Sequence, residues 1–292
     1  MRVVLLLLLV YSLPCAGAGQ QYEQIAASVS ERRVAEWIEA LFAMPRVGTP
    51  GREALAFLRS PTALGAAGEV TVERYRLPLP SPQVRSELRT GDLRVPLYPL
   101  WPNGVRTSSC RVQGPLVYAG SGSLAELSGH HVALQFNSGS NWRNAAALGA
   151  AAILFLEPPG TTRREADKKW SSLPLEVPRF YVRAQDAPKV LESTGRHVDV
   201  ACDQPWVAEE AVNLLVAIPG SDARLRNEWV VFAAYSDTVS VVPGMPHGAD
   251  QTAGLAALLE LVRHFKANPP KRSVLLLVTS GHFQGMAGMR AV

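Results

Sequence analysis

The chain has 292 residues, of which 47% are hydrophobic and 18% are charged. This composition is typical of a globular protein, and the length is sufficient for two domains. The net charge of +4 is small and dispersed, and the one dense basic stretch, residues 163–169, is interrupted by Glu165 and Asp167. We interpret that stretch as a solvated loop and expect no nucleic-acid partner.

The N-terminal segment has the pattern of a signal peptide. Arg2 gives it a positive start, residues 3–10 form an apolar run, and residues 16–18 are small, as at a cleavage site. The run is too short to cross a bilayer, which takes ~20 residues. We therefore expect residues 1–18 to be removed and the mature chain to be extracytoplasmic, whether secreted, periplasmic or membrane-attached. Acylation of Cys15 is the weaker alternative, because Pro14 stands where a small residue is needed.

Residues 19–84 are predicted to form the first part of an α/β domain. Apolar residues at helical spacing predict a helix over residues 20–44. The glycines and prolines of residues 46–51 predict a turn, and a second helix starts at residues 53–58. Alternating apolar and charged residues then predict a strand over 70–77 with one solvated face. The prolines of residues 78–82 indicate a joint between domains.

Residues 85–203 have a different character and are interpreted as a separate α+β unit. No cofactor-binding motif is recognised in it. Its predicted elements are strands over residues 114–120, 131–136 and 149–158, an alanine-rich helix over 142–148, and a strand followed by a helix within 177–192.

Two cysteines flank this unit. Cys15 would leave with the signal peptide, so that Cys110 and Cys202 remain. Cysteines outside the cytoplasm can pair, and a bond here would tie the entry of the unit to its exit. We predict this disulfide; two buried free thiols are the alternative that the sequence leaves open.

Residues 204–292 return to an α/β pattern. Apolar runs at 212–218 and 229–234 are typical of strands covered on both faces. A helix over 253–266 and a strand over 273–280 follow, and residues 281–285 form a turn. Ligands in open α/β sheets bind outside the carboxyl ends of the strands. Tyr235, Asp237 and His282 fall at those ends and mark the candidate site.

The order of these elements resembles the zinc aminopeptidase domain of the glutamate carboxypeptidase and transferrin receptor family. The resemblance rests on residues 213–288 and on the helix, turn, helix and strand of the N-terminal part. Residues 85–203, with their alanine run before residues 149–154, resemble the protease-associated domain inserted in such peptidases. The implied fold is a partial aminopeptidase-like mixed sheet with flanking helices plus that insert. Further strands carrying an Asp and a His ligand are expected after Val292. We therefore favour a fragment of a longer protein, with room for a membrane attachment beyond Val292, over a chain whose sheet is completed by a partner.

The family's metal-binding positions hold other residues here. Where the family has His-x-Asp, a bridging Asp and a Glu-Glu pair, this sequence has Tyr235-Ser236-Asp237, Gln251 and His282-Phe283. A phenol is a weak ligand at neutral pH, a neutral amide bridges two cations poorly, and a phenyl ring has no donor atom. The resemblance implies that Asp237 orients a ligand and that His282 stands at the general-base position. We therefore predict no zinc pair.

Three functions remain. The first is a non-catalytic binding or scaffolding ectodomain for a peptide or protein ligand, of undetermined oligomeric state. The second is an active zinc-dependent aminopeptidase or carboxypeptidase that hydrolyses peptides. Its relocated metal would be held by Asp237, His247, Asp250 and His282. The third is a serine hydrolase that uses Ser236 or Ser280, although no Gly-x-Ser-x-Gly turn surrounds either serine.

Overall fold

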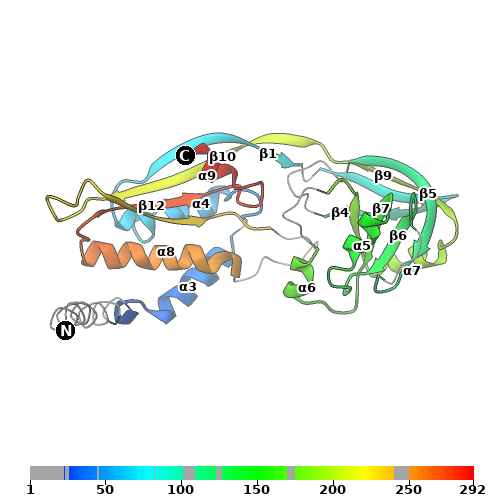
Figure 1. Ribbon diagram of the computed structural model, residues 1–292, viewed down its shortest axis with the longest axis horizontal. Helices are drawn as coiled ribbons and strands as arrows, with labels where there is room; N and C mark the ends of the chain where they lie inside the picture. The colour runs from blue at the N-terminus through cyan, green and yellow to red at the C-terminus, as the bar shows by residue number, and fades with distance from the viewer. Residues whose placement is uncertain are drawn as a thin grey trace, which may run out of the picture.

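A computed structural model describes residues 23, 26–44, 46–81, 83–100, 109–122, 127–169, 175–239 and 250–292. The signal peptide predicted at residues 1–18 lies outside these ranges. The described chain forms two lobes side by side, each built on its own β-sheet, and the paired strands β1 and β10 extend from the first lobe toward the second (Figure 1). No helix of the described residues has the length and apolarity needed to span a membrane.

The first lobe contains a four-stranded mixed sheet in the order β1-β10-β12-β11. Its strands are β1 (Thr71–Pro80), β10 (Trp206–Ile218), β11 (Trp229–Tyr235) and β12 (Ser273–Thr279). Strands β11 and β12 are parallel, and the other two pairings are antiparallel. The parallel register sets Tyr235 opposite Thr279, the last residues of β11 and β12. The residues that follow these two strands therefore start from the same edge of the sheet.

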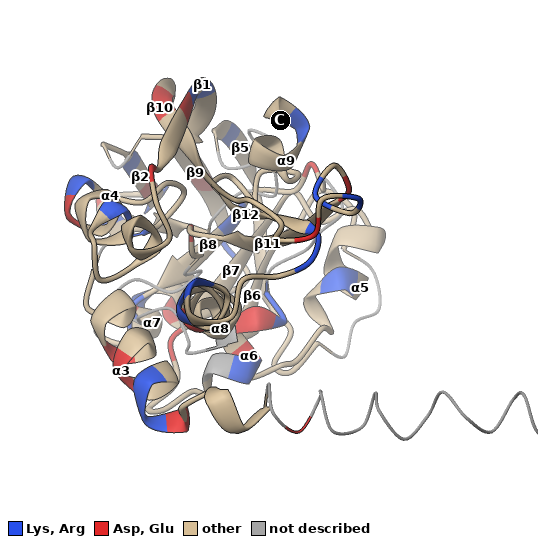
Figure 2. Ribbon diagram, turned by 90° about the vertical axis from the view of Figure 1, so that its left-hand side faces the viewer, with Lys and Arg blue, Asp and Glu red and all other residues tan. Residues whose placement is uncertain are grey.

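Four helical elements pack on one face of this sheet. They are α3 (Glu31–Phe42), α4 (Arg52–Arg59), the 3-10 helix η1 (Leu64–Ala66) and α8 (Asp250–Ala267). Helix α8 is seen end-on below the sheet in Figure 2, with α3 next to it. The Ser30 hydroxyl caps α3, and Arg33 reaches from α3 to the buried carboxylate of Glu260 on α8. This ion pair fixes the two helices to each other.

The opposite face is more open. The short helix α9 (Ala287–Ala291) packs there beside β1 and β10. On β11, the side chains of Trp229 and Val231 are both 53% exposed. Coverage of both faces, predicted from the apolar run of β11, is therefore wrong for the outer face within the described residues. The run is apolar on both sides, but only the side toward α8 has a described element packed on it.

The strand predicted over residues 70–77 is longer in the structure, and the chain passes from the first sheet to the second after it, before β2 (Arg85–Thr90) starts. Strand β1 continues to Pro80, and Leu77–Pro80 lies opposite Trp206–Glu209 of β10. Strand β1 is an edge strand of its sheet. A proline on such an edge forfeits no ladder hydrogen bond when its nitrogen faces outward, so these prolines extend the strand instead of ending it.

The second lobe is an eight-stranded sheet in the order β3-β2-β9-β5-β6-β7-β8-β4. Its strands are β2 (Arg85–Thr90), β3 (Leu93–Pro96), β4 (Tyr98–Pro99), β5 (Cys110–Tyr118), β6 (His131–Gln135), β7 (Ala152–Leu156), β8 (Arg179–Val182) and β9 (His197–Asp203). Strands β5 to β8 are parallel to one another. Helix α7 (Ala187–Glu192) covers one face, and α5 (Trp142–Ala147) and α6 (Arg163–Asp167) cover the other.

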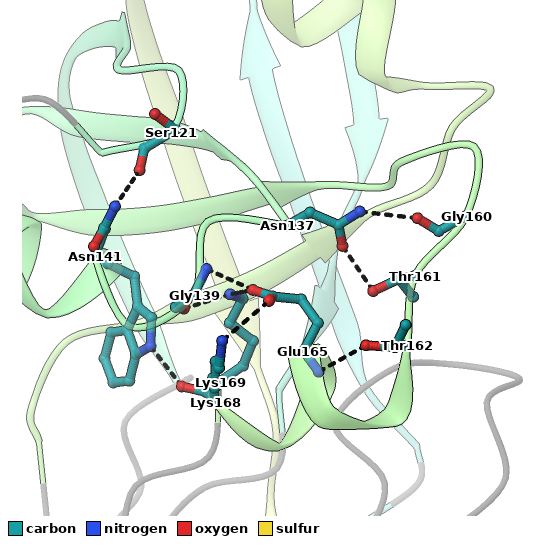
Figure 3. A network of polar contacts seen from close by, with 11 residues as sticks. Ser121, Asn137, Gly139, Asn141, Gly160, Thr161, Thr162, Glu165, Lys168 and Lys169 are labelled. Carbon is teal, nitrogen blue, oxygen red and sulfur yellow. Dashed lines mark hydrogen bonds and ion pairs between the residues drawn. The ribbon is translucent and has the colours of Figure 1, made fainter.

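A buried lysine anchors α6 to this lobe (Figure 3). The Lys169 ammonium has no exposed surface, donates to the Glu165 carboxylate at 2.7 Å and to the Gly139 carbonyl at 2.6 Å, and lies 5.1 Å from the ring centre of Phe136. Glu165 also accepts a bond from the Gly139 amide. Each polar group thus has a partner, which is the requirement for burying a charge. We interpret this network as structural.

Candidate functional site

The candidate site lies where β11 and β12 end. Tyr235 is the last residue of β11, and His282 follows β12 after a two-residue turn. The two rings stack with centroids 4.0 Å apart and planes inclined by 15°. The parallel register of β11 and β12 thus places these two side chains, both predicted at strand ends, in direct contact.

Phe283 completes an aromatic cluster with these residues. Its ring packs edge-on against Tyr235 at 5.7 Å and against His282 at 5.1 Å. Such edge-to-face contacts are a preferred geometry for aromatic pairs. Three side chains at positions where the resemblance implies metal chemistry are therefore packed against one another, and burial lowers the pKa of the His282 imidazole.

Asp237 is fully buried behind this cluster. Its Oδ1 accepts a hydrogen bond from the His282 amide at 3.1 Å, and its Oδ2 has no partner among the described residues. Burial raises the pKa of this carboxyl to about 7, against the opposing effects of the backbone amides and of the Arg46 charge. Burial of a carboxyl away from solvent disfavours its ionised form.

Arg46 is a site residue that the sequence pattern does not single out. It is fully buried and donates to three acceptors: the Leu41 carbonyl at 3.0 Å, the Ser236 carbonyl at 2.7 Å and the Thr252 hydroxyl at 2.7 Å. Burial lowers its pKa to about 10, although the nearby Asp237 carboxyl opposes that change. The only sequence signal is its place at the start of the glycine- and proline-containing turn.

Gln251 is buried at the start of α8 and bonds to the backbone. Its Oε1 accepts a hydrogen bond from the Val239 amide at 3.0 Å, so the oxygen of this amide is engaged by the backbone. Asp250 directly precedes it as the first residue of α8, so the helix entry keeps one carboxylate in its sequence. The side chain of Asp250 and the whole of His247 lie outside the described part of the chain.

The two serines proposed as nucleophiles are both committed to the backbone. Ser236 Oγ donates to the Thr279 carbonyl at 2.9 Å, and Ser280 Oγ donates to the Val212 carbonyl at 2.5 Å. Both serines are almost completely buried. A nucleophilic serine needs its hydroxyl bonded to a base and facing the substrate, so this arrangement does not support the serine hydrolase.

The described residues do not fit a zinc pair. They bring no three His, Cys, Asp or Glu side chains together in a way that would hold a metal ion. Of the four proposed relocated ligands, only Asp237 and His282 have described side chains, and it is the His282 amide that contacts the carboxylate. The part of the donor set that the structure describes thus falls short of the three or four anionic or imidazole ligands that zinc sites use.

The predicted disulfide residues lie in the other lobe. The structure records Cys110 and Cys202 as free thiols, the first partly exposed and the second buried. They are nevertheless direct partners in the register of β5 and β9.

Comparison with known proteins places the sequence similarity in one segment. Residues 213–291 match the model of peptidase family M28. A vacuolar membrane protease of Laccaria bicolor is 32% identical over 82 residues, which is 28% of this chain and 8% of that protein. The chain thus spans a small part of the curated relatives that it matches.

Comparison of structures covers most of the chain. A zinc aminopeptidase from Bacillus subtilis matches with a TM-score of 0.58 at 18% identity, over 88% of this chain and 62% of that one. An aminopeptidase from Aneurinibacillus sp. strain AM-1 matches with a TM-score of 0.53 at 18% identity, over 91% of this chain and 66% of that one. The described chain therefore has a mixed α/β fold like that of these aminopeptidases, and residues 213–291 are similar in sequence to peptidase family M28.

Proposed function

We propose that this chain is an exported, non-catalytic domain that binds or scaffolds a peptide or protein ligand. The observation that carries the proposal is the aromatic cluster of Tyr235, His282 and Phe283, which occupies the strand ends where a metallopeptidase of this fold would need metal ligands. A phenol, an imidazole stacked on it and a phenyl ring do not supply the anionic donors that a zinc pair needs. Fold alone does not carry the activity of the similar aminopeptidases to this chain.

The proposal includes a division of labour between the lobes. Residues 19–84 and 204–292 would form the peptidase-like part, and residues 85–203 would serve as a protease-associated insert that shapes access to the strand ends. The first strand of the second sheet in the sequence, β2, starts at Arg85, and the last, β9, ends at Asp203. These bounds support the division.

A peptidase assay separates this function from its main alternative, an active zinc-dependent aminopeptidase or carboxypeptidase. The full-length protein is incubated with the tripeptide Leu-Gly-Gly, with and without added zinc, and the peptide is quantified by mass spectrometry. We expect the peptide to be recovered intact in both cases. Zinc-dependent hydrolysis that a chelator stops would overturn the proposal.

Variants would locate any activity that appears. The alternative requires Asp237, which follows β11, and Asp250, the first residue of α8, so Asp237→Ala and Asp250→Ala should each abolish it. Asp92→Ala is the matched control, because Asp92 is an exposed turn residue of the other lobe. Activity that survives both site substitutions would point to a contaminating peptidase and not to this chain.

A further inference from the structure

The two cysteines of the second lobe occupy opposed positions in antiparallel strands. Cys110 is the first residue of β5, and the register pairs it with Cys202 of β9. Directly opposed residues of such strands have Cα atoms ~4.5–5.5 Å apart, with both side chains on the same face of the sheet. A disulfide requires a Cα separation of ~4.4–6.8 Å. The backbone therefore already places these side chains within reach of a bond.

The strands are fixed on both sides of this pair. Before it, the Ser109 hydroxyl donates to the Gln204 carbonyl at 3.0 Å and accepts from the Gln204 amide at 3.2 Å. After it, the register continues with Arg111 opposite Ala201. Strand β9 also pairs with β2 on its other edge, where Cys202 lies opposite Ser86. The strands thus hold the two cysteines opposite each other in the register.

The environment makes these thiols poor nucleophiles in the folded state. Burial raises the pKa of the Cys110 thiol to about 12, and it also raises the pKa of the Cys202 thiol. Reactive cysteines instead have lowered pKa values in electropositive surroundings. A catalytic or metal-binding role for the pair is therefore disfavoured, whereas a structural bond formed while the lobe folds is compatible with this burial.

We propose that Cys110 and Cys202 are joined by a disulfide that closes the second lobe where the chain leaves it for β10. In the step that forms it, one cysteine thiolate attacks the disulfide of a thiol–disulfide oxidoreductase, which gives a mixed disulfide. The second cysteine displaces the enzyme sulfur, and the oxidoreductase departs with both electrons and both protons as a dithiol. The bond encloses strands β5 to β9 and helices α5 to α7 in one covalent loop.

Peptide mapping of protein exported to an oxidising compartment tests the bond directly. Trypsin would release Cys110 within residues 107–111, Cys202 within 197–224 and Cys15, if retained, within 3–32. After alkylation without reductant, we expect peptides 107–111 and 197–224 to be recovered linked, and to separate on reduction. Recovery of both peptides singly alkylated, or of either one linked to Cys15, would overturn the proposal.

Thermal melting and hydrogen exchange test whether the bond stabilises the second lobe. In the double variant Cys110→Ala/Cys202→Ala we expect the melting temperature to fall by on the order of 10 °C, because a long loop is no longer closed in the unfolded chain. Amide exchange should accelerate in β5 and β9 but not in β12, which belongs to the other lobe and serves as the internal control. Equal exchange in β5 and β9 of variant and parent would show that no bond constrains the lobe.

Discussion

Replacement of Asp237 by asparagine should stabilise the protein at pH 8. The carboxyl is fully buried, and its pKa rises from the reference value of 3.8 to about 7. Because the folded pKa lies above the unfolded one, this group contributes its full stability below pH ~4 and loses it as the pH rises toward 7. Three pKa units correspond to a loss of about 4 kcal/mol in the free energy of unfolding at pH 8.

Asparagine removes this loss because it cannot ionise. Its Oδ1 can still accept the hydrogen bond from the His282 amide, and its Nδ2 takes the place of Oδ2, the atom without a described partner. Asp237→Asn should therefore behave as the protonated parent does at every pH. Its advantage over the parent should grow by about 3 kcal/mol between pH 5 and pH 8, since two of the three pKa units lie above pH 5.

Urea unfolding at pH 5 and pH 8 measures this advantage. Asp92→Asn, on an exposed turn, is the control and should show no such growth. Asp237→Ala should be less stable than Asp237→Asn at both pH values, because it loses the acceptor for the His282 amide. An Asp237→Asn protein that is less stable than its parent at pH 8 would refute the reasoning. That result would mean the carboxylate is ionised and held by Arg46 or by a metal.

Two further predictions concern packing. Gly288→Ala should lower the free energy of unfolding by about 2 kcal/mol or more, because its Cβ would lie 2.4 Å from the Ser280 carbonyl oxygen. Gly254→Ala, at an open position of a helix, should instead raise it by about 0.5–1 kcal/mol. Equal effects of the two substitutions in thermal melts would contradict this contrast. Glu165→Ala should cost about 3–5 kcal/mol because it leaves the buried Lys169 charge without its carboxylate. Lys169→Met should cost less, and the opposite order in urea unfolding would argue against a structural network.

Apolar periodicity predicted the long elements well. The helix predicted at 253–266 and the strand predicted at 273–280 are α8 and β12, with ends shifted by only a few residues. Both carry continuous apolar stripes that pack in one core. Strand β7, predicted within 149–158, is buried at all five positions. Packing thus reinforces the local pattern in these segments.

Two short strands of the second sheet were missed for a physical reason. Strand β2 has six residues with Leu88 as its one apolar side chain, and β9 has seven, in which apolar residues alternate with exposed polar or charged ones. Their pairing with each other joins segments more than a hundred residues apart, which no local window reports. The strand predicted to end at residue 77 runs on to Pro80, because prolines are tolerated on an edge strand and only the sheet order reveals that position.

For the candidate site, the sequence predicted where the residues lie in the fold better than it predicted the contacts that their side chains make. The parallel register brought Tyr235 and His282 together as expected from the strand ends. The buried Arg46 contacts Ser236, 190 residues away in the sequence. The side chain of Gln251 bonds to the backbone of Val239, 12 residues away. A single sequence gives no means to tell a buried arginine from an exposed one, so this part of the site emerged only from the fold.

The central claim is that the strand ends do not hold a zinc pair, and metal content tests it most directly. The full-length protein would be purified without chelator, dialysed, and its zinc measured per chain by elemental mass spectrometry before and after incubation with zinc. We predict well under one zinc per chain, with no stable gain on incubation and no change in Asp237→Ala or Asp250→Ala. One or two tightly held zinc ions that either substitution removes would contradict the account.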